Sequence, residues 1–360
     1  MALRESGKIV DMKVALVHDD LVQWGGAERV LGALTEIFPD APIYTLVYDK
    51  SNQILREKFS GKKIVTSFLQ NTPAWKTFYK PSFFLHPIAF EQFDFSGFDV
   101  VISQTTRFAK SIVTKPETIH ICYCHTPPRF LWNFSGERTG SYLGFFRKYD
   151  KISANRVDRW IAGSKNAQER IKDIYTFDSK VIYPYIDLGR FNGVESFDGG
   201  YFLVVSRLNG YKRADIAIKA ANKLGFPLKV VGDGPQMSFL QGIAGPTVEF
   251  LGKVNEQMLI KLLAGCKALI ISAEEDFGLT SIEAQALGKP VLAFEKGGAL
   301  ETVINGETGY FFKEQAVESL IQALDNLEKY GYNFKRCLNQ AQKFSKEKFT
   351  QEFQNLVSSL

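Results

Sequence analysis

The chain lacks the features that mark several large classes of protein. No apolar run approaches the roughly 18 to 20 residues that span a bilayer, and the opening stretch, MALRESGKIVD, is too short and polar for a signal peptide. Internal repeats and low-complexity segments are also missing. We therefore expect a cytoplasmic protein that is either free in solution or attached to the inner face of the cell membrane.

Cysteine is scarce, and its four copies have no paired spacing, which argues against a disulfide framework and favours a reducing compartment. Cys122 and Cys124 lie in an apolar stretch with only His125 adjacent, so we expect core thiols rather than metal ligands. We predict no metal and no cofactor. The net charge of +5 suits an anionic ligand or an anionic membrane surface, but no motif for reading nucleic acid is present.

What the sequence does contain is a regular alternation of apolar strands and helices. With 360 residues, of which 45% are hydrophobic, the chain is long enough for two domains. Residues 186–200, rich in glycine and acids, separate two alternating series and indicate a linker. Alternation predicts parallel sheets, so we expect an α/β protein with two doubly wound Rossmann-like domains facing a central cleft. The expected strands are KVALVH, IYTLVY, DVVISQ, IHICYC, RWIAGS and KVIYPY, then YFLVVSRL, LKVVGDGP, VEFLGKV, KALIISA and PVLAF.

The segment EEDFGLTSIEAQALGKPV is the most informative motif, because Glu275 and Glu283 flank the start of a predicted helix. Glu275 lies in the loop after the strand KALIISA, at the edge where open α/β sheets bind ligands. A helix is expected from near Thr280 to Gly288. Two plain alternatives exist: Thr280 and Glu283 fit a capping box, and Glu275 fits a solvated acidic loop.

Basic residues follow the first strand of the second series, at Arg207 and Lys212. An arginine fork and a lysine point charge could together neutralise a leaving diphosphate. The alternative is a solvated basic loop. Because Lys212 and Arg213 are adjacent, we expect only one of them to point inward.

In the first domain, Gly25 and Gly26 open a helix, whose free N–H groups suit a phosphate. They could equally be ordinary turn glycines. The fingerprint G-x-G-x-x-G is absent there, which counts against a nicotinamide or flavin dehydrogenase. His125 ends the strand IHICYC and is expected to bond a sugar or phosphate, while His18, Asp19 and Asp20 at the end of the first strand could meet an acceptor hydroxyl.

Lysines and aromatic residues interleave between residues 59 and 98, and again between 129 and 149. Such a patch can lie on an anionic lipid surface, whereas the alternative is that most of these aromatics belong to the core. The final helix carries an apolar stripe at helical spacing, composed of Phe349, Phe353, Leu356 and Leu360.

Taken together, these motifs resemble the retaining glycosyltransferases of family 4, which have the two-domain GT-B fold. The resemblance covers nearly the whole chain, from GGAERVL through YCHTPPRFLW, SRLNGYKRADIAI and VGDGP to EEDFGLTSIEAQALGKPV and GGALETVINGETGYFF. Within the family the chain looks most like bacterial mannosyltransferases of O-antigen and polysaccharide assembly. The resemblance implies an acceptor-side domain over residues 1–190, a nucleotide-sugar domain over 191–340, and a helix over 341–360 that packs back on the first domain.

Carried over by position, the resemblance implies a donor site and a catalytic set. Glu275 would hold the donor sugar's hydroxyls and Glu283 the ribose, while His125 would contact the transferred sugar. The diphosphate would meet Arg207, Lys212, the glycine loop Gly25–Gly26, and the backbone at Phe277, Gly278, Leu279 and Thr280. Thr280 and Ser281 stand where relatives often carry proline.

The resemblance also implies the reaction: a hexose, with mannose from GDP-mannose favoured, passes to a glycan or lipid-linked glycan with retention and without a metal. A sugar-nucleotide epimerase or a phosphorylase would use the same site for different chemistry. A non-enzymatic alternative is a membrane-surface binding module.

Overall fold

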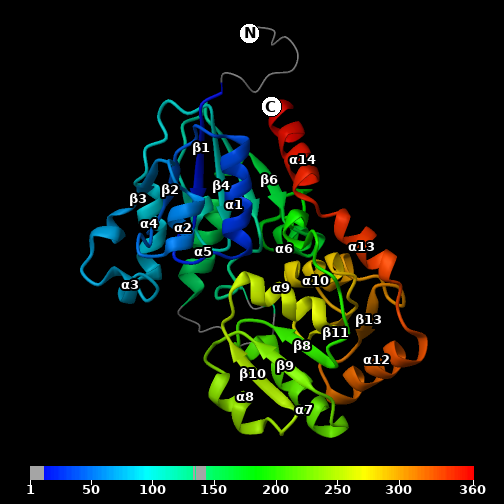
Figure 1. Cartoon of the computed structure of the whole chain (residues 1–360). Coiled ribbons are helices and arrows are strands. Elements are labelled where there is room, and N and C mark those ends of the chain that lie inside the picture. The colour runs from blue at the N-terminus through cyan, green and yellow to red at the C-terminus, as the bar shows by residue number, and fades with distance from the viewer. Residues whose placement is uncertain (1–11, 133, 135–142) are drawn as a thin grey trace. The chain divides into compact units, whose positions relative to one another are not determined.

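The computed structural model describes residues 12–132, 134 and 143–360. The opening stretch and part of the second aromatic-basic stretch, residues 133 and 135–142, lie outside the described residues. The chain divides into two compact units (Figure 1). Unit 1 comprises Met1–Pro184 and Phe349–Leu360, and unit 2 comprises Tyr185–Lys348. The domain limits expected at residues 190 and 340 stay predictions.

Unit 1 is built on a seven-stranded parallel sheet with the order β3-β2-β1-β4-β5-β6-β7. Every residue of β1 and β4 is buried, as expected for strands covered on both faces. The strands are β1 (Val14–His18), β2 (Ile43–Thr45), β3 (Ile64–Thr66), β4 (Val100–Thr105), β5 (Ile119–Cys124), β6 (Arg159–Ala162) and β7 (Lys180–Val181).

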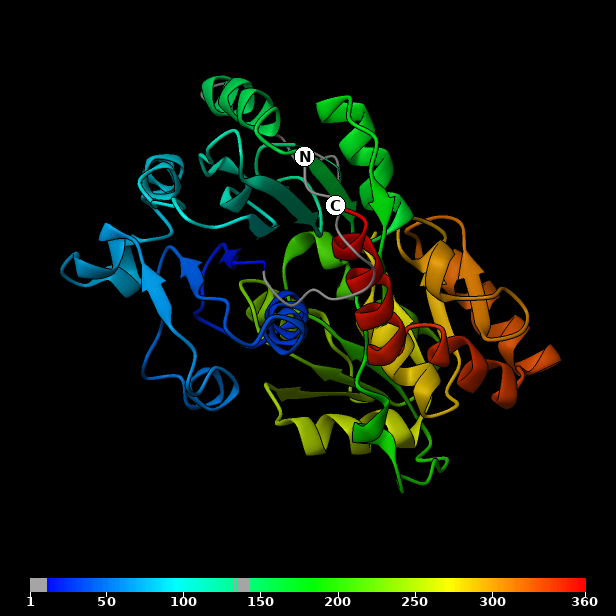
Figure 2. The ribbon, with the colours of Figure 1, turned by 90° about the horizontal axis from the view of Figure 1, so that it is seen from above.

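Helices cover both faces of this sheet, with α1 and α14 on one face and α5 on the other (Figure 2). Helix α1 buries Val30, Leu31 and Leu34, a stripe at helical spacing. The helices of unit 1 are α1 (Gly26–Ile37), α2 (Gln53–Lys58), α3 (Trp75–Phe78), α4 (His86–Glu91), α5 (Gly144–Ala154), α6 (Lys165–Tyr175) and the chain-terminal α14 (Lys346–Ser358). None of the described helices is both long and apolar enough to cross a bilayer.

Helix α14 packs on β5 through aromatic rings. The ring of Tyr123 lies 6.2 Å from that of Phe349 and 6.4 Å from that of Phe353. The third buried residue of the helix is Val357, whereas Leu356 and Leu360, which the predicted stripe included, are only half-buried. A spacing of four residues from Phe353 keeps Val357 on the buried face, so that part of the predicted stripe was wrong.

Unit 2 repeats the design with a six-stranded parallel sheet in the order β10-β9-β8-β11-β12-β13. Its strands are β8 (Tyr201–Val205), β9 (Leu228–Val231), β10 (Val248–Gly252), β11 (Cys266–Ile271), β12 (Val291–Phe294) and β13 (Gly309–Phe312). Its helices are α7 (Ala214–Leu224), α8 (Met237–Ile243), α9 (Glu256–Gly265), α10 (Leu279–Ala286), α11 (Ala299–Thr302), α12 (Val317–Tyr330) and α13 (Phe334–Gln342).

Two parallel α/β units confirm the predicted pair of Rossmann-like domains. Each strand expected from the sequence is present within a few residues of its predicted limits. The prediction omitted β3 and β13, because both are short edge strands, whose conformation depends on pairing with β2 or β12.

Candidate functional site

In unit 2 the strand order reverses at β8, which has β9 on one side and β11 on the other. Such a switch point opens a crevice at the carboxyl ends of the strands, where open α/β sheets bind ligands. The loops at this point are residues 206–213 after β8 and residues 272–278 after β11. All site residues predicted for the second domain lie in these loops or in the helix α10 that follows.

The structure brings Lys212 and Glu275 together across this switch point. Lys212 Nζ donates to both oxygens of the Glu275 carboxylate, at 2.7 and 2.6 Å. The side chains are 14% and 23% exposed, so solvent reaches the pair without surrounding it. A cation and a carboxylate therefore lie side by side at the ligand edge, 63 positions apart in sequence.

The neighbouring basic residues have other arrangements. Arg213 adopts a left-handed conformation with φ of 50° and pairs with Asp215 at 3.0 Å. The expectation that only one of Lys212 and Arg213 points toward the site is thus confirmed for Lys212. Arg207 is exposed, and among the described residues no hydrogen bond or ion pair joins its side chain to Lys212 or Glu275.

Two serines at the same edge were not predicted. In the described part of the chain, the Oγ atoms of Ser206 and Ser272, just beyond β8 and β11, are buried without a hydrogen-bond partner. A buried, unpaired hydroxyl costs about 1 to 3 kcal/mol, so such atoms at a switch point indicate a place for a ligand or water. Their signal in the sequence is a serine directly after each apolar run.

Glu283 occupies a different setting from the predicted capping box. Helix α10 begins at Leu279 with Gly278 as its N-cap, and no side chain among the described residues caps it. Thr280 is therefore the second helical residue and Glu283 the fifth, too far along to bond the cap, so that prediction was wrong. Glu283 is buried instead and accepts from Arg190 Nη1 at 3.1 Å.

A glycine-rich loop braces the Glu275 loop from behind. The N–H of Gly298 donates to the carbonyl of Glu275 at 2.8 Å. A Cβ at Gly298 would lie 2.3 Å from Phe277 Cα, so only glycine allows this approach. Gly278, with φ of 92°, turns the chain into α10. The backbone N–H groups of Leu279 and Thr280 then open that helix at the ligand edge.

In unit 1 the predicted glycine loop opens α1, with Gly25 as N-cap and Gly26 as first helical residue. The N–H of Gly25 already donates to Glu28 Oε2 at 2.8 Å, which leaves Gly26 and the following amides at the helix start. Glu28 is buried beside His18. Burial raises the pKa of Glu28, but the hydrogen bond and charge of His18 outweigh it and lower the pKa overall.

Asp19 has a structural role rather than the predicted contact with an acceptor hydroxyl. It is buried and accepts from the backbone N–H groups of Thr106, Arg107, Phe108 and Ala109 at 2.6 to 3.0 Å. Burial raises its pKa, while Arg107 and these N–H groups lower it further than burial raises it. The Asp19 carboxylate therefore holds the loop after β4 in its conformation.

His125 follows β5, and its ring contacts two residues that sequence analysis did not single out. The Nε2 atom lies 2.6 Å from Nε2 of Gln104, at the end of β4, and the ring meets Tyr123 edge-on at 5.0 Å. The signal for Gln104 was a polar residue ending the apolar run DVVIS. The site residues of unit 1 and unit 2 thus each gather at the carboxyl edge of their own sheet.

Two protein-family models together match most of the chain. A model described as Glycosyltransferase Family 4 matches residues 24–190, and one described as Glycosyl transferases group 1 matches residues 190–347. The chain is a family 4 glycosyltransferase. The resemblance predicted from its motifs is confirmed, and its fold is the GT-B fold.

Known glycosyltransferases resemble the chain at low identity. An alpha-1,3/1,6-mannosyltransferase of Dictyostelium discoideum is 38% identical over 120 residues, which cover 31% of this chain and 28% of that protein. The matching enzyme of Mus musculus is 22% identical over 419 residues and covers 99% of this chain and 98% of its own. An Anabaena structure in complex with UDP-glucose has a TM-score of 0.71 at 19% identity, covering 97% of this chain and 100% of its own.

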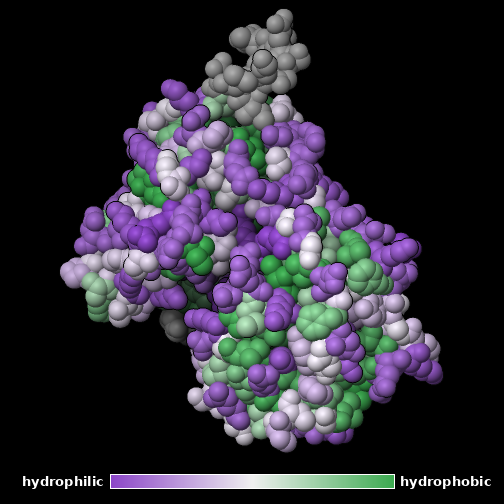
Figure 3. Space-filling model, in the orientation of Figure 1, coloured by the Kyte–Doolittle hydropathy of each residue, from purple (hydrophilic) through white to green (hydrophobic). Residues whose placement is uncertain are grey.

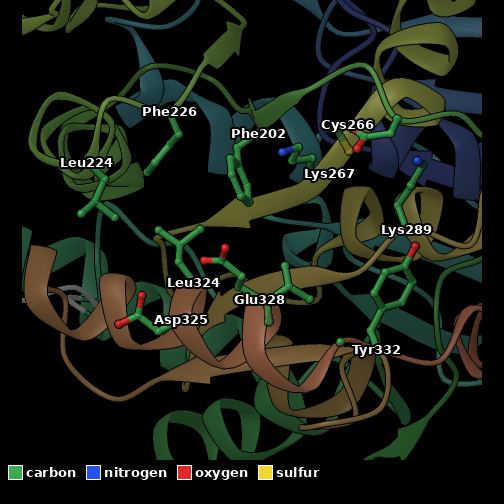
Figure 4. A pocket seen from close by; sticks show the side chains of 13 residues that line it. Phe202, Leu224, Phe226, Cys266, Lys267, Lys289, Leu324, Asp325, Glu328 and Tyr332 are labelled. Carbon is green, nitrogen blue, oxygen red and sulfur yellow. The ribbon is translucent and has the colours of Figure 1, made fainter.

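A pocket of about 700 Å³ lies at the opposite edge of the unit 2 sheet of this glycosyltransferase (Figure 4). Phe202 and Cys266, at the amino ends of β8 and β11, form part of its lining. Apolar side chains there mix with lysines and with the carboxylates of Asp325 and Glu328. None of the predicted donor-site residues lines it, so this pocket is separate from the switch point.

The aromatic-basic stretches of this glycosyltransferase divide between core and surface. Tyr79 and Phe90 are buried, whereas Phe78, Phe84 and Phe145 are 57%, 51% and 73% exposed. Apolar residues reach the surface over α3, at the left edge of the space-filling view (Figure 3). The core interpretation is therefore confirmed for the buried rings, while binding of the exposed rings to a membrane stays a prediction.

Trp132 shows the core role most clearly. Its Nε1 donates to Asp150 at 2.8 Å, and Asp150 also accepts from Lys110 and from the hydroxyl of Tyr175. Lys110 and Asp150 are fully buried. A buried charge pair of this kind needs every hydrogen bond it makes, so it anchors the indole firmly.

Proposed function

We propose that the protein transfers a hexose, with mannose from GDP-mannose favoured, from a nucleoside diphosphate sugar to a glycan or lipid-linked glycan in cell-surface polysaccharide synthesis, with retention of anomeric configuration. The observation that carries the proposal is the Lys212–Glu275 pair at the switch point of unit 2. The mannosyltransferase relatives favour mannose, and the Anabaena complex with UDP-glucose keeps a uridine donor as the competing choice.

In the proposed reaction, the bond from the anomeric carbon to the diphosphate breaks as the bond to the acceptor oxygen forms on the same face. The acceptor's proton passes to the departing diphosphate. Lys212, Arg207 and the N–H groups at the start of α10 stabilise the negative charge that develops there, a role that a metal ion performs elsewhere. Glu275 holds the donor sugar's hydroxyls, Glu283 serves the ribose, and His125 contacts the transferred sugar.

The Lys212–Glu275 pair gives the test of this proposal. Purified protein is offered GDP-mannose or UDP-glucose with a glycan acceptor, and the product is analysed by mass spectrometry and NMR. Lys212→Ala should lower kcat/KM by about 10² to 10³, because charge stabilisation at the leaving group is lost. Glu275→Gln should lower it by roughly tenfold or more, because an ionised hydrogen-bond acceptor becomes neutral.

Lys223→Ala is the matched control, since Lys223 also pairs with a carboxylate, Glu318, but on an exposed surface of the same unit. It should retain full activity. Full transfer by both Lys212→Ala and Glu275→Gln would reject the site. An isomerised or phosphorolysed sugar in place of transfer would instead point to an epimerase or a phosphorylase.

The exposed rings of unit 1 support an anionic membrane surface as a further partner. The rings of Phe84 and Phe145 are linked through those of Phe83 and Phe146, with neighbouring ring centroids 5.2 to 6.3 Å apart. The exposed Lys148 follows Phe145 by three positions in α5, which places both on one side of the helix. Rings that enter the interface add apolar binding, and the bases add attraction to anionic lipid.

Vesicle sedimentation tests this partner, with phosphatidylglycerol vesicles compared with phosphatidylcholine vesicles. Phe84→Ser with Phe145→Ser should weaken binding to the anionic vesicles by about tenfold or more, since burying a phenylalanine contributes roughly 1.5 to 3 kcal/mol. Phe239→Ser, which removes a ring 52% exposed on unit 2, is the control and should leave binding unchanged. Equal binding by all variants would exclude this surface.

A further inference from the structure

Gln104 is a buried amide that lies between helix α1 and His125. Its Nε2 atom lies 2.6 Å from the carbonyl oxygen of Ala27 and 2.6 Å from His125 Nε2. A backbone carbonyl can only accept a hydrogen bond. The end of the amide that faces Ala27 must therefore be the NH₂ group, which settles the orientation that the two similar ends of a glutamine usually leave open.

The same NH₂ group determines the state of the histidine. One of its hydrogens goes to Ala27 and the other points to His125, and an amide nitrogen offers no lone pair in return. His125 Nε2 must then be the acceptor and carry no proton. Because a neutral imidazole has one N–H, that hydrogen must be on Nδ1.

We propose that Gln104 is a positioning residue that holds His125 as the neutral, Nδ1-protonated tautomer. The ring then acts through its Nδ1–H as a hydrogen-bond donor, and Nε2 is closed to proton transfer with the substrate. The tautomer follows from the contacts in unit 1 alone, while its use in catalysis rests on the proposed contact between His125 and the transferred sugar. That contact would suit a sugar hydroxyl or phosphate oxygen that accepts.

Neighbouring contacts hold the histidine in this orientation. Its backbone N–H donates to the carbonyl of Thr105 at 3.0 Å, and its ring meets Tyr123 edge-on at 69°. The hydroxyl of Tyr123 in turn donates to Ile182 at 2.8 Å, and Phe349 and Phe353 of α14 pack on the same ring. Gln104 itself is held in β4, where it pairs in register with His18 of β1 on one side and with Tyr123 of β5 on the other.

The Oε1 end of the Gln104 amide is in an unfavourable environment in this arrangement. Within the described residues, Oε1 of Gln104 is buried and has no hydrogen-bond partner. Turning the amide over would give Oε1 no donor at Ala27, since that position is a carbonyl, and would place two acceptors 2.6 Å apart. The observed orientation therefore remains the favourable one.

Nitrogen NMR of the full-length protein, labelled with ¹⁵N-histidine, measures the tautomer directly. The chain has four histidines, so a His125→Gln spectrum assigns the resonance. We expect His125 Nε2 at the unprotonated shift and Nδ1 at the protonated shift. Gln104→Leu should let both tautomers appear, and Gln104→Glu, whose carboxylate accepts, should favour a proton on Nε2.

Ser103→Ala is a matched control, because Ser103 Oγ pairs with Nε2 of His120 at 2.7 Å on the adjoining strand position. It should change the resonances of His120 and leave those of His125 in place. Thermal melting and circular dichroism of each variant report whether it folds. If Gln104→Glu does not fold, Gln104→Leu still decides the matter, and the wild-type spectrum needs only the His125→Gln comparison that assigns it.

Activity then separates this inference from the proposed function. Gln104→Leu should lower kcat by about tenfold or more and change KM for the nucleotide sugar little, since Lys212 and Glu275 in unit 2 bind the diphosphate and sugar. A protonated Nε2 in the wild type, or a tautomer unchanged in Gln104→Leu, overturns the inference. A shifted tautomer with unchanged kcat supports the inference and rejects the proposed role of His125.

Discussion

At the scale of single residues, His120 is a histidine that the fold keeps neutral. It is fully buried in β5, with Nε2 2.7 Å from Ser103 Oγ and Nδ1 2.9 Å from the carbonyl of Arg156. Burial lowers its pKa from 6.5 to about 4. The unfolded chain therefore binds a proton at this residue below pH 6.5, while the folded chain does so only below about pH 4.

This difference predicts a loss of stability in acid. Between pH 6.5 and 4 the unfolded state binds more protons, so the free energy of unfolding falls as the pH falls, by roughly 3 kcal/mol for this residue. His120→Gln cannot be protonated and should lack that part of the decline. Urea unfolding at several values of pH measures it, and parallel declines in wild type and variant would contradict the prediction.

At the scale of elements, α14 packs against β5, the strand that His125 directly follows. Phe353 is fully buried against Tyr123. Phe353→Ala should lower the free energy of unfolding by about 3 to 5 kcal/mol, because it removes a large apolar group and leaves a cavity. Urea denaturation followed by circular dichroism gives the value.

Gln351→Ala, at an exposed position of the same helix, is the control and should change stability by no more than about 0.5 kcal/mol. Equal effects of the two substitutions would mean that α14 does not stabilise unit 1 through this contact. The tautomer of His125 offers a second readout, since loss of the Phe353 ring loosens the support of Tyr123.

At the scale of the whole molecule, the chain forms two compact units. The Glu275 motif, with the diphosphate contacts predicted for it, lies in unit 2. We expect GDP or UDP alone to slow hydrogen exchange over residues 206–213 and 272–286 and to stabilise the protein by about 2.7 kcal/mol at a hundred times Kd. Hydrogen-exchange mass spectrometry measures both regions. Lys212→Ala should remove the protection, and a flat response to both nucleotides would contradict the donor site.

The sequence by itself determined the strands, the alternation with helices, the two-domain α/β class and the edge at which the site residues gather. It could do so because apolar runs and the glycines that follow them are local patterns, and because parallel strands bring their carboxyl ends to one edge. The tertiary structure decided the partners: Glu275 pairs with Lys212, Glu283 with Arg190, and His125 with Gln104. The two residues of each pair are far apart in the chain. The distance between them in space depends on strand order, on register and on the direction in which each side chain points.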